Sequence, residues 1–483
     1  MDQLIAMNSR TTIGIALVLA LLVAAIPSTA VSDEVLPLSI QSALKIRNVP
    51  DQALSIYVED VATGEVILAW NDAIARNPAS VEKMVTTLVA LDTLGPAYRW
   101  KTEVSFLGDI QDGVLDGDIA LKGYGDPYLV TERFWELLRD IRAAGINSIS
   151  GDLLIDDSHF AVGDYDPAAF DREPLRAYNV SPNALLTNFK VVRHFFEPAN
   201  DGTGIQVRMD PDLQNLDIVN QLRMANGSCR GYQRGITITP NEDVSRITFS
   251  GRFPSGCEIY SMTRAALSHN EFTYGLFRSL WEESGGVLSG AWRNVVLDPN
   301  LEPTLVFESL PLSEIITKVN KHSNNVMAKQ LLYTLATEEI GPAGTEAKGR
   351  QVVDKWLAER GLASTEMRLA NGAGLSRSSR VTAKHLSELL RYAYDSPYMP
   401  EYVSSLSLSG MDGTLRRRLR NNGLSGQAHM KTGSLDHVSA IGGYLQSRSG
   451  RRFIVVAMLN HTDVHRGPGE EVQESLLRWL YDQ

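Results

Sequence analysis

Three short motifs occur in one order along the chain of 483 residues: Ser80-Val81-Glu82-Lys83, Ser323-Asn324-Asn325 and Lys431-Thr432-Gly433. The interval from Lys83 to Ser323 is 240 residues, whereas the interval from Ser323 to Lys431 is only 108 residues. If the three motifs form one site, the chain must leave that site after the first motif and return for the second. The sequence therefore predicts a discontinuous main domain with one or two domains inserted between its parts.

The choice among serine motifs depends on context, because the short patterns recur in the chain. Ser42-Ala43-Leu44-Lys45 has the spacing of the first motif, and Ser181-Pro182-Asn183 and Ser268-His269-Asn270 have that of the second, whereas Lys-Thr-Gly occurs once. Ser80 follows a turn signal and opens an apolar run of helical spacing, so a helix there places Lys83 one turn further along the same face. No sustained helical pattern follows Ser42, and we expect Ser80 to be the functional serine.

A serine hydroxyl becomes a strong nucleophile only when a base removes its proton. We expect Lys83 to be that base, which requires its pKa to be lowered by burial and by a second cation nearby. Lys431 is the candidate for that cation, and the two lysines would titrate as a coupled pair. The backbone N–H groups of Ser80 and Ser434 are expected to stabilise the developing oxyanion.

The remaining motif residues predict how a substrate is held. We expect Ser323 to relay a proton to the leaving amine and the Asn325 amide to bind a peptide carbonyl. Lys431 and Thr432 would bind a free carboxylate at the end of the substrate, and Gly433 would leave room for it beside the strand. A cationic subsite beyond the scissile bond selects chains that end there, so these residues predict carboxypeptidase chemistry. The nine histidines form no metal-binding pattern, and we expect no metal and no other cofactor.

Hydrophobic periodicity divides the chain into a strand-rich middle and a helical later part. Short alternating runs between turn signals predict strands at 102–107, 153–155, 235–239 and 245–249, with one helix at 131–144. Helical patterns at 312–322 and 326–337 put the second motif in the connection between two helices. Near the end, the pattern predicts a meander of strands at 429–433, 438–445 and 453–459 and a final helix at 470–481.

The N-terminal segment has the pattern of a secretory signal. Fourteen apolar residues at 13–26 follow Arg10, and small residues at 28–30 offer a cleavage site, so we expect residues 1–30 to be removed on export. The apolar run is too short to span a bilayer comfortably, although an uncleaved anchor and a start at Met7 stay as alternatives. We expect a periplasmic or otherwise extracytoplasmic protein with no transmembrane anchor after signal removal.

The cysteine content and the net charge bear on the compartment of the protein and on its partners. Cys229 and Cys257 each lie among loop-forming residues, and in an exported protein they are expected to form one disulfide, with two unrelated thiols as the alternative. The formal net charge of −11 argues against nucleic acid as a partner.

Six further segments accompany the three motifs: Asn77-Pro78-Ala79, Gly125-Asp126-Pro127, Leu154-Ile155-Asp156-Asp157-Ser158, Tyr178-Asn179, Gly372-Ala373-Gly374-Leu375-Ser376-Arg377 and Asp412-Gly413-Thr414-Leu415-Arg416. With them, the chain resembles the class C low-molecular-mass penicillin-binding proteins, the D-alanyl-D-alanine carboxypeptidase and endopeptidase family. The resemblance implies an α/β (α+β) fold, a serine β-lactamase/transpeptidase-like domain with inserted mostly-β domains. We expect a catalytic domain at 31–95 and 290–483, inserted domain II at 96–175 and 262–289, and inserted domain III at 176–261.

The resemblance also implies peptidoglycan stem peptides as substrates and β-lactam antibiotics as acylating inhibitors. Family members recognise the free end of a diaminopimelate side chain with an aspartate and an arginine, which by motif would be Asp156 and Arg377, with Asp157 as the alternative aspartate. The chain departs from the family at Asn371-Gly372-Ala373-Gly374, where Asp-Gly-Ser-Gly is common. We expect this segment to affect substrate preference without touching the nucleophile or the base.

The leading interpretation is a serine-type D-Ala-D-Ala carboxypeptidase, with or without endopeptidase action on cross-links, that works through an acyl-enzyme on Ser80. A serine β-lactamase is the second interpretation, but no Glu-x-x-Leu-Asn segment lies between Asn325 and Lys431. A non-catalytic cell-wall peptide-binding protein is the third, but such a protein needs neither Ser80 nor Lys83.

Overall fold

The computed structural model describes residues 35–199, 204–231, 234–420 and 423–483. The expected signal segment at residues 1–30 lies outside these ranges. Residues 36–483 form one folded unit, to which all the following elements belong. Within the described ranges, no helix combines the length and the apolar character that crossing a membrane requires.

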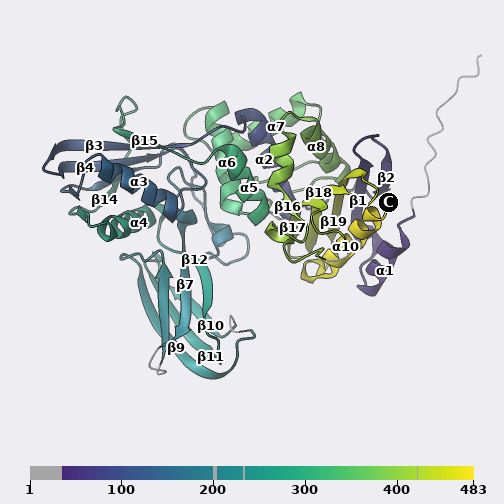
Figure 1. Ribbon diagram of the computed structural model, residues 1–483, viewed down its shortest axis with the longest axis horizontal. Coiled ribbons are helices and arrows are strands. Elements are labelled where there is room, and N and C mark those ends of the chain that lie inside the picture. The colour runs from purple at the N-terminus through teal and green to yellow at the C-terminus, as the bar shows by residue number, and fades with distance from the viewer. Residues whose placement is uncertain (1–34, 200–203, 232–233, 421–422) are drawn as a thin grey trace, which may run out of the picture. The chain divides into compact units, whose positions relative to one another are not determined.

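Six strands form an antiparallel sheet: β1 (Leu54–Asp60), β2 (Val66–Trp70), β16 (Ser407–Leu408), β17 (Ala428–Leu435), β18 (Val438–Gln446) and β19 (Arg452–Asn460). Their order across the sheet is β16-β17-β18-β19-β1-β2, so early and late parts of the chain lie side by side (Figure 1). The expected meander is confirmed, because β17, β18 and β19 are neighbours in sequence and in the sheet.

Helices complete this part of the molecule: α1 (Leu38–Ile46), α2 (Lys83–Leu94), α5 (Leu312–His322), α6 (Asn325–Glu339), α7 (Glu346–Glu359), α8 (Ala383–Asp395), α9 (Met399–Ser405) and α10 (Pro468–Tyr481). The expected helices at 312–322, 326–337 and 470–481 correspond to α5, α6 and α10. Along β19, Ile454 and Val456 belong to the buried core that includes α2, α5 and α8, whereas Val455 and Leu459 belong to the core that includes α1 and α10. Both faces of the strand are buried, which explains why it is apolar throughout.

The chain between α2 and α5 forms further sheets, the largest with seven strands: β3 (Lys101–Gln111), β4 (Val114–Gly123), β5 (Ser148–Ile149), β6 (Leu153–Asp156), β13 (Val287–Leu288), β14 (Trp292–Asn294) and β15 (Leu305–Glu308). Two helices that contact each other, α3 (Thr131–Ala143) and α4 (His269–Glu283), pack against it. The helix expected at 131–144 is α3. The domain boundaries stay a prediction, although β14 and β15 follow residue 290 and still pair within this sheet, which favours a boundary closer to α5.

Two three-stranded sheets complete the inserted part: β7 (Val191–Pro198), β8 (Ile205–Asp210) and β12 (Tyr260–Ala265) form one, and β9 (Asp217–Ser228), β10 (Ile236–Pro240) and β11 (Arg246–Gly256) form the other. Phe196 of the first sheet and Phe249 of the second contact each other edge to face in a shared core. Cys229 and Cys257, at the ends of β9 and β11, form a disulfide, as expected. The mostly-β insertion and the mixed α/β class are therefore confirmed.

Candidate active site

Ser80 lies in a short 3₁₀ turn, η2 (Ala79–Glu82), which leads directly into α2. The sequence placed Ser80 at the start of an α-helix, and this is corrected: the α-helix begins at Lys83. The reason is local, since Ala79 has a φ of 47° and its N–H donates to Asn77 Oδ1 at 2.8 Å, which turns the chain sharply before the serine.

Lys83 is fully buried, and its Nζ reaches three oxygen atoms. It lies 2.9 Å from Ser80 Oγ, 2.6 Å from Asn325 Oδ1 and 2.5 Å from the carbonyl oxygen of Ala373. These contacts fix the amine against the serine hydroxyl. The first two motifs are therefore brought together as the sequence predicts.

The electrostatic setting favours a neutral amine beside the serine. Burial lowers the pKa of Lys83 well below the usual lysine value, and the positive charge of Lys431 lowers it further. Lys431 is also fully buried, and burial lowers its pKa to about 7. In the described part of the chain, the lysines that form ion pairs are Lys101, Lys122, Lys321 and Lys355, so neither Lys83 nor Lys431 has a carboxylate partner.

The junction of α5 and α6 presents the second motif. Ser323 ends α5 in the left-handed conformation (φ 54°), and the Asn324 side chain caps α6 by accepting a hydrogen bond from the Met327 N–H at 3.1 Å. Asn325, the first residue of α6, accepts from Lys83 through Oδ1, and its Nδ2 lies 3.4 Å from the Tyr178 carbonyl oxygen. The junction therefore turns Ser323 and Asn325 towards the same site.

Strand β17 carries the third motif. Lys431 Nζ donates to Ser323 Oγ at 2.9 Å and to the carbonyl oxygen of Thr432 at 2.7 Å, while Thr432 Oγ1 donates to Thr414 Oγ1 at 2.8 Å. A Cβ at Gly433 would lie 2.4 Å from the Pro78 carbonyl oxygen and 3.0 Å from the Ser80 nitrogen. The absence of a side chain at Gly433 thus allows β17 to approach η2. The sequence predicted that this glycine leaves room for substrate, but its nearest neighbours are backbone atoms of the protein itself.

A cavity of about 390 Å³ opens over these groups. Five of the residues expected in the site line it: Ser80, Ser323, Asn325, Arg377 and Ser434. Lys83 and Lys431 lie behind its wall. The Arg377 guanidinium lies over the Phe170 ring, 4.7 Å from its centroid, and 3.4 Å from an Asp436 carboxylate oxygen.

Asp156 is not brought to this cavity. It ends β6, is fully buried, and accepts hydrogen bonds from the backbone N–H groups of Ser158 and Leu297, with Lys122 Nζ 3.6 Å away. The neighbouring Asp157 accepts from Asn183. The acidic residues that do line the cavity are Asp171 and Asp436, which the sequence analysis did not single out.

The segment at 371–374 contradicts one expectation. The sequence analysis separated it from the base, yet the Ala373 carbonyl accepts a hydrogen bond from Lys83, and the Gly372 N–H donates to Glu82. A backbone carbonyl leaves no signature in a sequence. The glycine pattern has two structural reasons: φ is 70° at both Gly372 and Gly374, and a Cβ at Gly374 would lie 1.9 Å from the Ala79 carbonyl oxygen.

Comparison with known proteins finds relatives over most of the chain. A family model described as the D-Ala-D-Ala carboxypeptidase 3 (S13) family matches residues 37–482. D-alanyl-D-alanine carboxypeptidase from Actinomadura sp. (strain R39) is 28% identical over 437 residues, 86% of this chain and 78% of that protein. D-alanyl-D-alanine carboxypeptidase DacB from Haemophilus influenzae is 23% identical over 444 residues, 88% of this chain and 90% of that protein.

Solved structures show the same fold. The crystal structure of penicillin binding protein 4 (dacB) from Haemophilus influenzae superposes with a TM-score of 0.78 at 21% identity, covering 92% of this chain and 100% of that one. A predatory endopeptidase from Bdellovibrio bacteriovorus gives a TM-score of 0.56 at 16% identity, covering 89% of this chain and 92% of that one. The fold is that of a penicillin-binding protein.

The chain belongs to the D-Ala-D-Ala carboxypeptidase 3 (S13) family. The family resemblance and the enzyme class that the sequence predicted, a serine-type D-Ala-D-Ala carboxypeptidase, are therefore confirmed.

Proposed function

We propose that the protein trims peptidoglycan stem peptides that end in D-Ala-D-Ala, through an acyl-enzyme on Ser80 with Lys83 as the base. The observation that carries the proposal is the 2.9 Å contact between Nζ of the fully buried Lys83 and Oγ of Ser80, which lines the cavity. Burial favours the neutral amine, which accepts the hydroxyl proton as Ser80 Oγ bonds to the scissile carbonyl carbon.

Two backbone N–H groups, those of Ser80 and Ser434, stabilise the oxyanion of the tetrahedral intermediate. The C–N bond then breaks as the departing amine of the last D-alanine receives, by way of Ser323, the proton that Lys83 removed from Ser80 Oγ, which leaves Lys83 neutral again. The contact between Ser323 Oγ and Lys431 Nζ supports this relay. Water releases the shortened peptide from Ser80 in the second half of the reaction.

Thr432 binds the terminal carboxylate of the substrate, the charge of Lys431 attracts that carboxylate from behind the cavity wall, and the Asn325 amide holds a peptide carbonyl. The absence of a carboxylate partner for Lys431 among the described residues supports an anionic ligand there. A cross-link whose amine side carries a free carboxylate presents the same chemistry, so endopeptidase action uses the same groups.

The diaminopimelate side chain, on the acyl side of the scissile bond, contacts Arg377. Position and charge support this role, since Arg377 lines the cavity with Ser80 and is half-exposed. Asp171 and Asp436 replace Asp156 in the proposal as acidic partners for an ammonium group, because they line the cavity.

The reaction takes place outside the cytoplasm, after export by the signal at residues 1–30. Penicillins and other β-lactam antibiotics acylate Ser80 because they present a reactive carbonyl and a carboxylate to the same groups. A crystal structure of penicillin binding protein 4 from Haemophilus influenzae in complex with a β-lactam supports this step.

The test is D-alanine release from a purified stem pentapeptide by the mature protein, compared with Ser80→Ala and Ser42→Ala. Ser42 provides the matched control, because it starts the other Ser-x-x-Lys pattern and is exposed on α1. We expect Ser80→Ala to abolish release and Ser42→Ala to keep it. Release by Ser80→Ala at the wild-type rate would exclude this site.

The same experiment with cross-linked peptidoglycan distinguishes carboxypeptidase from endopeptidase action, because the two kinds of product differ in mass. Rapid steady hydrolysis of penicillin would instead indicate a β-lactamase. Tight binding of the pentapeptide without alanine release would indicate a binding protein.

A further inference from the structure

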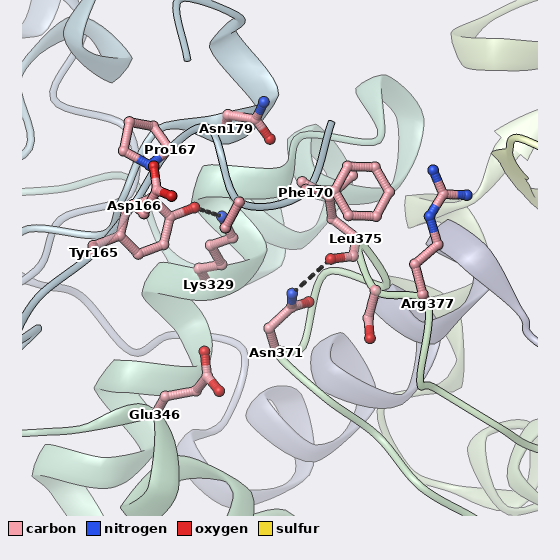
Figure 2. Close-up of a pocket in the computed structure, with 12 residues that line it drawn as sticks. Tyr165, Asp166, Pro167, Phe170, Asn179, Lys329, Glu346, Asn371, Leu375 and Arg377 are labelled. Atoms are coloured by element: carbon pink, nitrogen blue, oxygen red, sulfur yellow. Dashed lines mark hydrogen bonds between the residues drawn. The ribbon is translucent and has the colours of Figure 1, made fainter. Parts of the chain in front are cut away.

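A second cavity of about 340 Å³ adjoins the catalytic one (Figure 2). The two cavities share Phe170, Leu375 and Arg377 in their walls. A peptide whose scissile bond lies at Ser80 can therefore continue past Leu375 into the second cavity. Nothing in the proposed acyl-transfer chemistry uses the residues at its far end.

Lys329 forms part of that far end. It follows Asn325 by four residues on α6, so the two side chains project from the same helix face, one turn apart. Its side chain is turned towards Tyr165, as Figure 2 shows, and Nζ donates to the Tyr165 hydroxyl at 2.6 Å and to the Val180 carbonyl oxygen at 3.3 Å. Lys329 is only 4% exposed although it lines a cavity.

This lysine has no counter-ion among the described residues. Ion pairs of lysine there involve Lys101, Lys122, Lys321 and Lys355, and both contacts of Lys329 Nζ are to neutral oxygen atoms. Glu346 lines the same cavity, but its carboxylate is paired with Arg350 at 3.1 Å. Among the described residues, Lys83 and Lys431 are the other buried lysines without a carboxylate partner, and both contact serines of the acyl-transfer site.

A pKa of about 8 leaves the ammonium form of Lys329 in the majority at neutral pH. Burial lowers its pKa to about 8, and the Glu346 charge acts in the opposite direction. An ammonium group held out of water without a partner is costly, so a site that retains one is suited to an anion that arrives with a ligand.

We propose that the second cavity binds a carboxylate on the acyl side of the peptide substrate, with Lys329 as its counter-ion. The inference rests on the proposed function, since it names a further part of the same substrate. Stem peptides carry free carboxylates upstream of the scissile bond, on the γ-linked D-glutamyl residue and on diaminopimelate. This subsite is distinct from the Lys431 subsite, which takes the carboxylate at the leaving end.

Binding to Ser80→Ala protein tests the subsite separately from turnover. Three pentapeptides serve as probes: one with both acyl-side carboxylates free, one amidated at the glutamyl residue and one amidated at diaminopimelate. Calorimetry gives each Kd in the Ser80→Ala background, alone and combined with Lys329→Met. Lys190→Met is the matched control, because Lys190 is a partly buried lysine that lines neither cavity.

We expect amidation at one of the two residues to weaken binding about 10- to 100-fold, the range for a lost hydrogen bond to a charged group. Lys329→Met should bring that ratio to about one, whereas Lys329→Arg and Lys190→Met should leave it unchanged. The residue whose amidation weakens binding to Ser80→Ala protein, but not to the protein that also carries Lys329→Met, holds the carboxylate that pairs with Lys329. If Lys329→Met does not fold, as judged by its thermal transition, Lys329→Gln provides the same neutralisation.

An amidation effect that survives in the neutral variants, or no amidation effect at either residue, would overturn the inference. Failure of the proposed function gives a different result, namely wild-type protein that neither releases D-alanine nor is acylated by penicillin, whatever the binding ratios are.

Discussion

The close approach of β17 to η2 makes Gly433→Ala the most informative single substitution. An added Cβ would lie 2.4 Å from the Pro78 carbonyl oxygen, whereas ordinary contacts begin at 3.4 Å, so the two backbones must separate by about 1 Å. Both neighbours are backbone atoms that cannot rotate away. The displacement moves the N–H of Ser434 relative to that of Ser80, the pair proposed to stabilise the oxyanion.

A displacement of this size is expected to reduce the rate of acylation by about 100-fold or more, the usual effect of misplacing catalytic groups by about 1 Å or losing one oxyanion donor. Overpacking should also lower the free energy of unfolding by about 1–3 kcal/mol. Rapid-quench acylation by a fluorescent penicillin gives the rate, and thermal unfolding confirms that the variant is folded at the assay temperature.

Gly442→Ala is the matched control. Gly442 of β18 pairs with Lys431 of β17. Its added Cβ would be too close only to the terminal methyl of Met84, at 2.9 Å, which can move, because its next neighbour, Val81 Cγ1, lies at an ordinary contact distance of 3.7 Å. We expect near-wild-type acylation for this variant. Wild-type acylation by folded Gly433→Ala would refute the proposed oxyanion geometry.

Three further predictions concern charge and the disulfide. With a peptide that ends in a free carboxylate, kcat/KM should fall above about pH 7, where Lys431 loses its proton. In Lys431→Arg, this fall in kcat/KM should occur at a higher pH. A fall at the same pH in both proteins would argue against the carboxylate subsite. Because the pKa of Lys431 is lower in the folded than in the unfolded protein, the unfolded state binds more protons between about pH 7 and 10, and stability rises with pH across that range. Lys431→Met should therefore raise the Tm at about pH 6, with a gain that disappears near pH 10, and a gain independent of pH would contradict this account. Replacing Cys229 and Cys257 by serine removes a cross-link between residues 28 positions apart and should lower the free energy of unfolding by about 3–4 kcal/mol. The rate of Ser80 acylation should stay unchanged. Slower acylation in the folded variant would mean that the inserted sheets control the site.

Much of the fold follows from local patterns in the sequence. The strands β17, β18 and β19 are recognisable because each is a short apolar run between turn residues, and their antiparallel order follows from the short connections. The α5–α6 junction is recognisable because two helical patterns stop on either side of Ser323. Motif order and the long interval after Lys83 indicate the insertion without any knowledge of its sheets.

The parts that sequence reasoning missed depend on tertiary contacts. Asp156 matches a family motif, but pairing of β6 with β4 and β14 buries it, and burial cannot be read from a motif. The Ala373 backbone carbonyl accepts a hydrogen bond from Lys83 although the two residues are 290 positions apart in the sequence. One feature of the sequence could have indicated Lys329: it is a charged residue four positions after Asn325, on a helix face that is otherwise apolar. Its cavity could not be predicted in the same way, because Tyr165 and Phe170 of the insertion line it.

The account depends most directly on acylation of one named serine. The decisive measurement is peptide mapping by mass spectrometry of the mature protein after brief reaction with benzylpenicillin. We predict a single penicilloyl adduct on Ser80, absent from Ser80→Ala and unaffected in Ser42→Ala. An adduct on another residue, or equal labelling of Ser80→Ala, would contradict the assignment of the site.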